Sequence, residues 1–169
     1  MLCFNPRPTR VRSNLADFNL MLIIAFYRNR VLAYKVMPRR QTVNGDQFLI
    51  FLRDTLWPTV RENRIYRSII LMDNARPHFS PEINDFMRLR RWERLEHPAY
   101  SPDMNPCDFD GIMRIKCPLK ARRFANESEL IEALRESIIE VSESRDFKGI
   151  TNLPKQWNKI MTENGDYVV

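Results

Sequence analysis

Two aspartates in this sequence stand where strands and helices bring acidic side chains to the edge of a sheet. The run from Ser68 to Met72 predicts a buried strand, and it ends abruptly in Asp73. A second acid, Asp108, stands at the start of a predicted helix that follows the next short strand. If these two strands are parallel neighbours, both acids lie at the carboxyl end of the sheet, where ligands bind in such folds.

Two carboxylates brought together at that edge would repel each other, and a divalent cation would relieve the repulsion. Hard oxygen ligands favour Mg²⁺ or Mn²⁺. Such a site suits attack on a phosphodiester, in which one ion activates the nucleophile and another stabilises the leaving oxygen.

Each acid also has an ordinary structural interpretation. An Asp-Asn pair after a strand, as at Asp73 and Asn74, often forms only a turn, and an aspartate before a helix often only caps it. Asp103 and Asp110 lie close to Asp108, and composition does not choose among the three.

The rest of the chain alternates between predicted strands and helices. Apolar runs predict a hairpin with strands at 20–27 and 31–37, followed by strands at 69–72 and 92–96. Capping patterns predict helices that begin near Asn44, Ser80, Cys107 or Asp108, and Asn126, with a last one around 154–161. Pro58 disturbs the first helical pattern, and residues 1–19 look irregular. This order predicts an α/β layered fold.

Composition narrows the class of protein. A length of 169 residues fits one domain, and the longest apolar run, 20–26, is too short to cross a bilayer. Three sparse cysteines, Cys3, Cys107 and Cys117, without an apparent secretory leader, indicate reduced thiols in an intracellular protein.

The net charge of +6 comes mainly from arginine, whose planar fork suits phosphate oxygens. One segment without acids carries five cations that could contact DNA, although a solvated surface explains them equally well: Arg114, Lys116, Lys120, Arg122 and Arg123.

Three separated motifs occur in order along the chain: D-N-A-R-P-H (73–78), H-P-A-Y-S-P-D-M-N-P-C-D-F (97–109) and G-I-x-x-L-P-x-x-W (149–157). With these motifs the sequence resembles the mariner-type transposases of the DDE/D superfamily. The resemblance runs from about residue 6 to the C-terminus. Thirty-four residues separate Asp73 from Asp108, which is the spacing of the second and third catalytic aspartates in the mariner branch.

The resemblance implies a fold and a site. The fold is an RNase H-like mixed sheet with helices on both sides, and Asp73 and Asp108 are catalytic residues that bind Mg²⁺ or Mn²⁺. Asp103 is implied to be structural. Asn74 and His78 belong to the first motif, which makes a role beside the ligands or facing DNA plausible; simple packing or loop capping is an equal alternative.

The resemblance also implies that part of the family's catalytic domain is missing from this sequence. The family's first aspartate lies on the first, central strand of the sheet, roughly ninety residues before the second. Neither Asp17, which precedes the hairpin, nor Asp54, inside a predicted helix, stands on such a strand. We therefore expect residues 1–169 to form a single partial catalytic domain. The first strand, its aspartate and the N-terminal helix-turn-helix domains are expected to be absent.

These observations lead to one functional hypothesis and one alternative. The hypothesis is a truncated mariner-type transposase fragment, by ancestry a metal-dependent nuclease and strand transferase, inactive as this chain. It would bind DNA non-specifically in the nucleus without membrane contact, and pairing of two copies stays open. The alternative is a non-catalytic remnant that binds nucleic acid or a protein partner.

Overall fold

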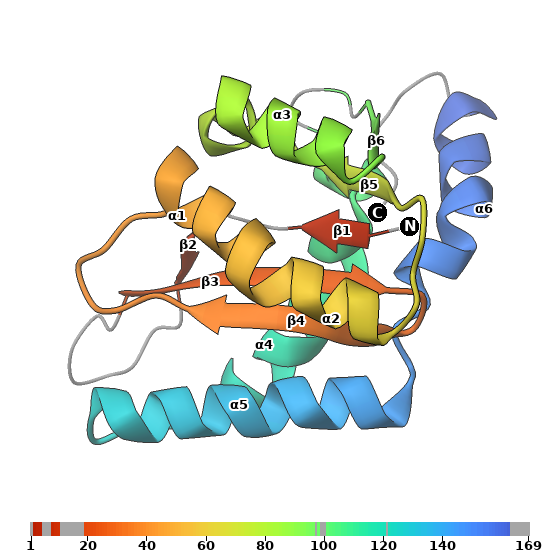
Figure 1. The fold of residues 1–169 in the computed structure, drawn as a ribbon. Coiled ribbons are helices and arrows are strands. Elements are labelled where there is room, and N and C mark those ends of the chain that lie inside the picture. The colour runs from red at the N-terminus through yellow and green to blue at the C-terminus, as the bar shows by residue number, and fades with distance from the viewer. Residues whose placement is uncertain are drawn as a thin grey trace.

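A mixed sheet of six strands forms the centre of the computed structural model (Figure 1). The structure describes residues 2–4, 8–10, 19–96, 98, 101–120 and 122–162, with side chains described from residue 20 onward. The strands are β1 (Leu2–Phe4), β2 (Pro8–Arg10), β3 (Asn19–Tyr27), β4 (Arg30–Val36), β5 (Ile69–Met72) and β6 (Glu93–Leu95).

The hairpin of β3 and β4 anchors the sheet and divides the core in two. Successive side chains of a strand point to opposite faces. Ile23 and Ala25 of β3 accordingly join one apolar cluster, while Leu22, Ile24 and Phe26 join a second cluster on the other face. Both faces of β3 are buried, which explains why its sequence is apolar almost throughout.

Helices cover both faces of the sheet (Figure 1). The first cluster packs against α1, η1, α2 and α3, and the second against η4, α4 and α5. The helical segments are α1 (Gly45–Ile50), η1 (Phe51–Leu56), α2 (Trp57–Glu62), η2 (Arg76–His78), α3 (Pro81–Leu89), η3 (Pro102–Met104), η4 (Cys107–Gly111), α4 (Ile112–Lys120), α5 (Glu127–Ser144) and α6 (Gly149–Thr162).

The central position of the sheet is occupied, which corrects the prediction that the first strand is lacking. Strand β1 lies between β3 and β5, antiparallel to the former and parallel to the latter. Cys3 is the partner of both Phe26 and Leu71 in the register. The buried edges of β3 and β5 need main-chain hydrogen-bond partners, and three extended residues of any sequence can supply them. Residues 1–19 are therefore not wholly irregular.

The first helix and the last helix are both longer than predicted, and each contains a proline. Pro58 does not end the first helix, since η1 is a π-helical segment in which the Trp57 amide donates to Leu52, five residues back. The helix continues through Pro58 to Glu62. Helix α6 begins at Gly149, before the predicted start, and carries Pro154 inside it.

The other predicted elements are confirmed to within a few residues. Asn44, Ser80 and Asn126 each cap a helix through a side-chain oxygen, as their spacing predicts. No helix in the described part of the chain combines the length and apolar character that a membrane crossing needs.

Candidate active site

Asp73 stands directly after the last residue of β5. Ile70, Leu71 and Met72 are buried, and the Asp73 residue is itself only 8% exposed. A carboxylate so little exposed requires polar partners. Its Oδ1 accepts a hydrogen bond of 3.1 Å from the Ala75 amide, which tightens the turn after the strand.

His78 is the second partner of Asp73. The short helix η2 turns the chain back, and His78 Nδ1 comes 2.9 Å from the Asp73 carbonyl oxygen and 3.1 Å from Asp73 Oδ1. Because both neighbours are acceptors, the Nδ1 atom carries the proton. The ring is fully buried and lies 4.5 Å from the ring of Phe48. His78 is thus a fully buried side chain in contact with Asp73, whereas Asn74 is exposed.

Arg94 of β6 completes the support of this turn. Its guanidinium donates to the His78 carbonyl oxygen at 2.9 Å and lies over the Phe79 ring. The guanidinium is partly desolvated in this position, and that burial lowers the pKa of Arg94 from its usual high value. Sequence reasoning missed Arg94, because a contact between residues sixteen positions apart leaves no local pattern.

Asp108 lies half-buried in η4 and is held by a fully buried neighbour, Asn105. The Asn105 amide nitrogen donates to Asp108 Oδ2 at 2.9 Å, and its Oδ1 accepts from the Cys107 amide. Asn105 was also missed, although an asparagine three residues before an aspartate at a helix start is a recognisable capping signal.

Asp110 and Asp103, the two competing acids, have other tasks. The Asp110 carboxylate accepts from the Lys148 and Gly149 amides at 2.9 and 2.7 Å, so it caps α6, and it also pairs with Arg114. Asp103 lies in η3, where its main-chain carbonyl accepts from Gln156. These contacts give Asp110 a structural role and fit the choice of Asp108 as the candidate ligand.

The helix that carries Asp108 packs against the centre of the sheet. A Cβ atom added to Gly111 would come 2.5 Å from the Phe26 ring, so the backbone of η4 lies directly on β3. Phe26 is aligned through Cys3 with Leu71 of β5, two residues before Asp73. Among the described side chains, no group of three or more His, Cys, Asp and Glu residues is placed to hold a metal ion.

The five predicted DNA-contacting cations do not form one free surface. Arg114 pairs with Asp110, and Arg122 lies 3.5 Å from Glu136. Burial lowers the pKa of Lys116, an effect that the nearby Asp108 carboxylate opposes and Lys120 reinforces. Four of the five are exposed, whereas Lys116 is half-buried; the exposed ones are Arg114, Lys120, Arg122 and Arg123.

The expectation of three reduced thiols is wrong for Cys107. Cys107 is disulfide-bonded, whereas Cys117 is exposed and free. Sequence spacing cannot reveal a bridge between distant positions, because a disulfide depends on the distance and direction of the two Cβ atoms.

Comparison with known proteins identifies the family. The sequence model of the family described as DDE superfamily endonuclease matches residues 7–131 of this chain. This chain belongs to the DDE superfamily endonucleases. The chain of residues 1–169, called the DDE domain below, is also 29% identical over 168 residues to the Mariner Mos1 transposase of Drosophila mauritiana. The alignment covers 96% of this chain and 49% of that protein. It is 35% identical over 101 residues to the human histone-lysine N-methyltransferase SETMAR, covering 59% of this chain and 14% of that protein.

Solved structures agree with this assignment. The crystal structure of the catalytic domain of Mos1 mariner transposase superposes with a TM-score of 0.86 at 24% identity, covering 99% of this chain and 83% of that one. The Mos1 catalytic domain with Raltegravir and Mg gives the same TM-score and identity, with 99% and 85% coverage. The Mos1 paired-end complex with the left transposon end gives 0.81 at 28% identity, with 96% and 48% coverage.

The DDE domain is therefore a homologue of the mariner transposase catalytic domain, with the predicted RNase H-like fold. It spans about half or less of the length of the curated relatives it matches.

Proposed function

We propose that the DDE domain binds a divalent cation and duplex DNA, as the remnant or part of a mariner-type DNA cleavage and strand-transfer enzyme. The observation that carries this proposal is the position of Asp73, held at the tip of a central strand by Ala75 and His78. A buried carboxylate fixed by two donors at the end of a parallel strand is arranged for ligand binding at that edge.

The carboxylate oxygens of the two aspartates suit the proposed cation as ligands. Asp73 and Asp108 offer hard carboxylate oxygens, which suit Mg²⁺ or Mn²⁺. Such an ion supplies Lewis-acid activation of a nucleophile and neutralises charge on the phosphate. In this domain Asp73 and Asp108 would hold it, while His78 and Asn105 keep the two carboxylates in place.

Strand β1 limits the chemistry of this polypeptide. It carries Leu2, Cys3 and Phe4, and the first acidic residue of the sequence is Asp17. Two aspartates do not readily fix two ions at the separation of about 3.5 to 4 Å that in-line displacement needs. We therefore expect the 169-residue polypeptide to bind a cation weakly and to leave DNA uncut.

DNA binding would rest on charge rather than on base recognition. The net charge is +6, and Lys120 and Arg123 are exposed beside the helix that carries Asp108. Contacts between such cations and phosphates release counterions, so affinity should fall steeply with salt and vary little with sequence. Action on DNA also implies a location in the nucleus. Two copies of the chain could pair, and light scattering measures whether the purified chain is a monomer or a dimer.

The deciding experiment measures three properties of the purified chain: Mn²⁺ binding by calorimetry, duplex binding as a function of salt, and nicking of supercoiled plasmid. We expect weak Mn²⁺ binding that Asp73→Asn and Asp108→Asn each abolish, salt-sensitive DNA binding, and no nicking above background. Asp85→Asn is the matched control, since Asp85 is an exposed carboxylate on α3 whose one ion pair within the described residues is with Arg88.

Two outcomes would change the proposal. DNA binding with Mn²⁺ affinity unaffected by either aspartate variant would favour the non-catalytic remnant. Metal-dependent nicking that Asp73→Asn removes would show that two aspartates suffice. In a chain extended by an acid-bearing strand, cleavage should depend on Asp73 and Asp108 together.

A further inference from the structure

A second candidate site lies at the end of the sheet opposite to Asp73. A cavity of about 180 Å³ opens where the loops before β5 and β6 meet the start of α2. Its lining comprises Trp57, Ile65, Tyr66, Arg67, Arg90, Arg91 and Trp92. Arg67 precedes β5 by two residues and Asp73 follows it, so the two sites are separated by the length of that strand.

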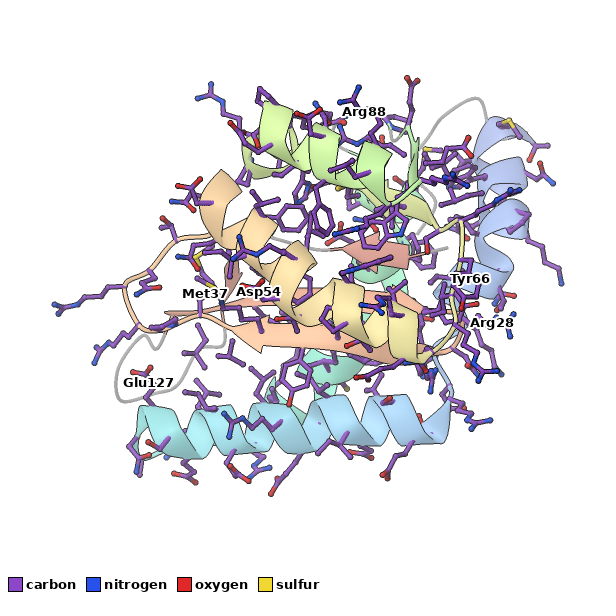
Figure 2. The ribbon with its side chains drawn as sticks, viewed as in Figure 1. Arg28, Met37, Asp54, Tyr66, Arg88 and Glu127 are labelled. Atoms are coloured by element: carbon purple, nitrogen blue, oxygen red, sulfur yellow. The ribbon has the colours of Figure 1, made fainter. Side chains whose placement is uncertain are left out.

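Aromatic side chains form the walls of this cavity. The rings of Trp57 and Trp92 meet edge to face at 6.0 Å, and Trp92 also packs against Phe86. Tyr66 lies at the rim with 76% of its surface exposed (Figure 2). An exposed tyrosine over an aromatic-lined cavity offers a face on which a planar ring can stack.

Arg90 brings a cation into the cavity, and no carboxylate among the described residues pairs with it. Its guanidinium lies 4.5 Å from the Trp57 ring centre and 5.3 Å from that of Phe86, so aromatic rings fix its position. Its Nε atom is buried and makes no hydrogen bond in the described structure. A buried donor without a partner is unfavourable, so the rings rather than hydrogen bonds hold this side chain at the cavity.

The remaining charges are also positive. Arg67 and Arg91 line the cavity from the two loops, and the described lining residues include no carboxylate. Within the described residues, none of the three arginines forms an ion pair. Exposed guanidinium groups of this kind bind phosphate oxygens well.

We propose that this cavity binds one nucleotide unit, with the base against Tyr66 and Arg90 and the phosphate on Arg67 and Arg91. The volume supports the size of the ligand, because an apolar cavity of about 150 Å³ accepts a benzene ring. A single pyrimidine fits that scale. The ligand is then a free pyrimidine nucleotide or an unpaired nucleotide of a single strand, and neither source requires the metal site.

The test compares two ligands that differ only in their bases. Binding of a short labelled oligothymidylate and of an abasic oligomer of equal length is measured in EDTA by anisotropy and by quenching of tryptophan fluorescence. Stacking of one base should make oligothymidylate bind about five- to a hundredfold more tightly than the abasic oligomer. Quenching should accompany only the oligomer with bases, since Trp57 and Trp92 line the cavity.

Matched variants locate the effect. Arg90→Met keeps the aliphatic stem and removes the fork, and Tyr66→Ala removes an exposed ring without disturbing the core. Both should abolish the preference for bases. Arg88→Met is the control, because it removes the same charge two positions away, at the end of α3, from an exposed side chain that does not line the cavity (Figure 2).

The outcomes are distinct. Competition by thymidine monophosphate at the same site would identify a free nucleotide, whereas competition by the oligomer alone would identify a strand. Equal binding of both oligomers would overturn the proposal. So would equal effects of Arg90→Met and Arg88→Met, or stronger competition by an acidic phosphotyrosine peptide than by either nucleotide ligand. Because EDTA removes the cation, failure here leaves the metal site untouched.

Discussion

The imidazole of His78 lies 2.9 Å from the main-chain oxygen of Asp73 and 3.1 Å from its carboxylate, so one buried ring fixes both the backbone and the side chain of the candidate ligand. Its other nitrogen, Nε2, is buried and has no hydrogen-bond partner in the described structure. Among the described residues, the hydrogen bonds of this ring therefore go to Asp73, while its face packs against Phe48.

Replacing His78 should loosen Asp73. His78→Ala should lower Mn²⁺ affinity about tenfold or more, because groups that orient metal ligands are worth about 10- to 100-fold in affinity. It should also cost about 2 to 4 kcal/mol of unfolding free energy through the cavity it leaves. His78→Asn keeps a donor near the Nδ1 position and should recover part of the affinity but little of the stability. Calorimetry measures the Mn²⁺ affinity, and urea unfolding measures the free energy of unfolding. Equal Mn²⁺ affinity in the parent and both variants would contradict a role of His78 in positioning Asp73.

Substitutions of Asp108 and Asp110 should differ in their effect on Mn²⁺ affinity: only the first should change it, while both should lower the free energy of unfolding. Asp110→Ala removes the acceptor of two amides at the start of α6 and should cost about 1 to 3 kcal/mol, with Mn²⁺ affinity unchanged. Asp108→Ala should abolish Mn²⁺ binding and should cost about 1 to 3 kcal/mol of unfolding free energy, because the buried Asn105 amide loses its acceptor. If the two variants exchanged these effects, Asp110 would be the ligand.

Much of the framework was predictable because its signals are local. Strand β3 and the last three residues of β5 are buried and read as apolar runs, and the caps at Asn44, Ser80 and Asn126 follow fixed spacings. The turn that carries His78 back to Asp73 spans only five residues. Such features depend on near neighbours in the sequence.

Features that depend on distant contacts were missed or misjudged. A strand of three residues, β1, has no periodicity to detect, and it exists because β3 and β5 need partners. Arg94 and the cap that Asp110 places on α6 join residues far apart in the chain. The pairing of Arg114 with Asp110 is a different case, because the two residues are only four positions apart and their spacing alone could have indicated the contact.

Turn conformation was also hidden from sequence reasoning. All six described non-glycine residues with positive φ are arginines: Arg28, Arg40, Arg64, Arg67, Arg91 and Arg145. Arginine gives no turn signal, since glycine, asparagine and aspartate are the residues that favour this region.

Arg145 offers a direct test of that strain. It follows α5 with φ of 54°, the left-handed position that glycine usually occupies after a helix. Arg145→Gly should raise the unfolding free energy by about 0.5 to 1 kcal/mol, because an L side chain costs about 1 to 2 kcal/mol there and glycine loses part of that gain to chain entropy. Arg135→Gly, inside the same helix, should instead lower it by about 1 kcal/mol. Urea unfolding distinguishes these signs, and destabilisation by both variants would contradict the interpretation.

The pH dependence of stability should report on Lys116. Burial lowers its pKa below the ordinary 10.5, and the Asp108 carboxylate partly opposes this shift. Between the folded pKa and 10.5 the unfolded chain holds more protons than the folded one, so stability rises with pH across that window. At neutral pH the charged, partly buried amine is a cost, and Lys116→Met should remove both this cost and the alkaline rise. Asp108→Asn should lower the Lys116 pKa further and widen the window, which NMR titration of the lysine side chain measures directly. A Lys116 pKa that is higher in Asp108→Asn than in the parent would contradict the assigned effect of Asp108. A stability that declines with pH in this window in the parent but not in Lys116→Met would show that burial does not dominate at this position.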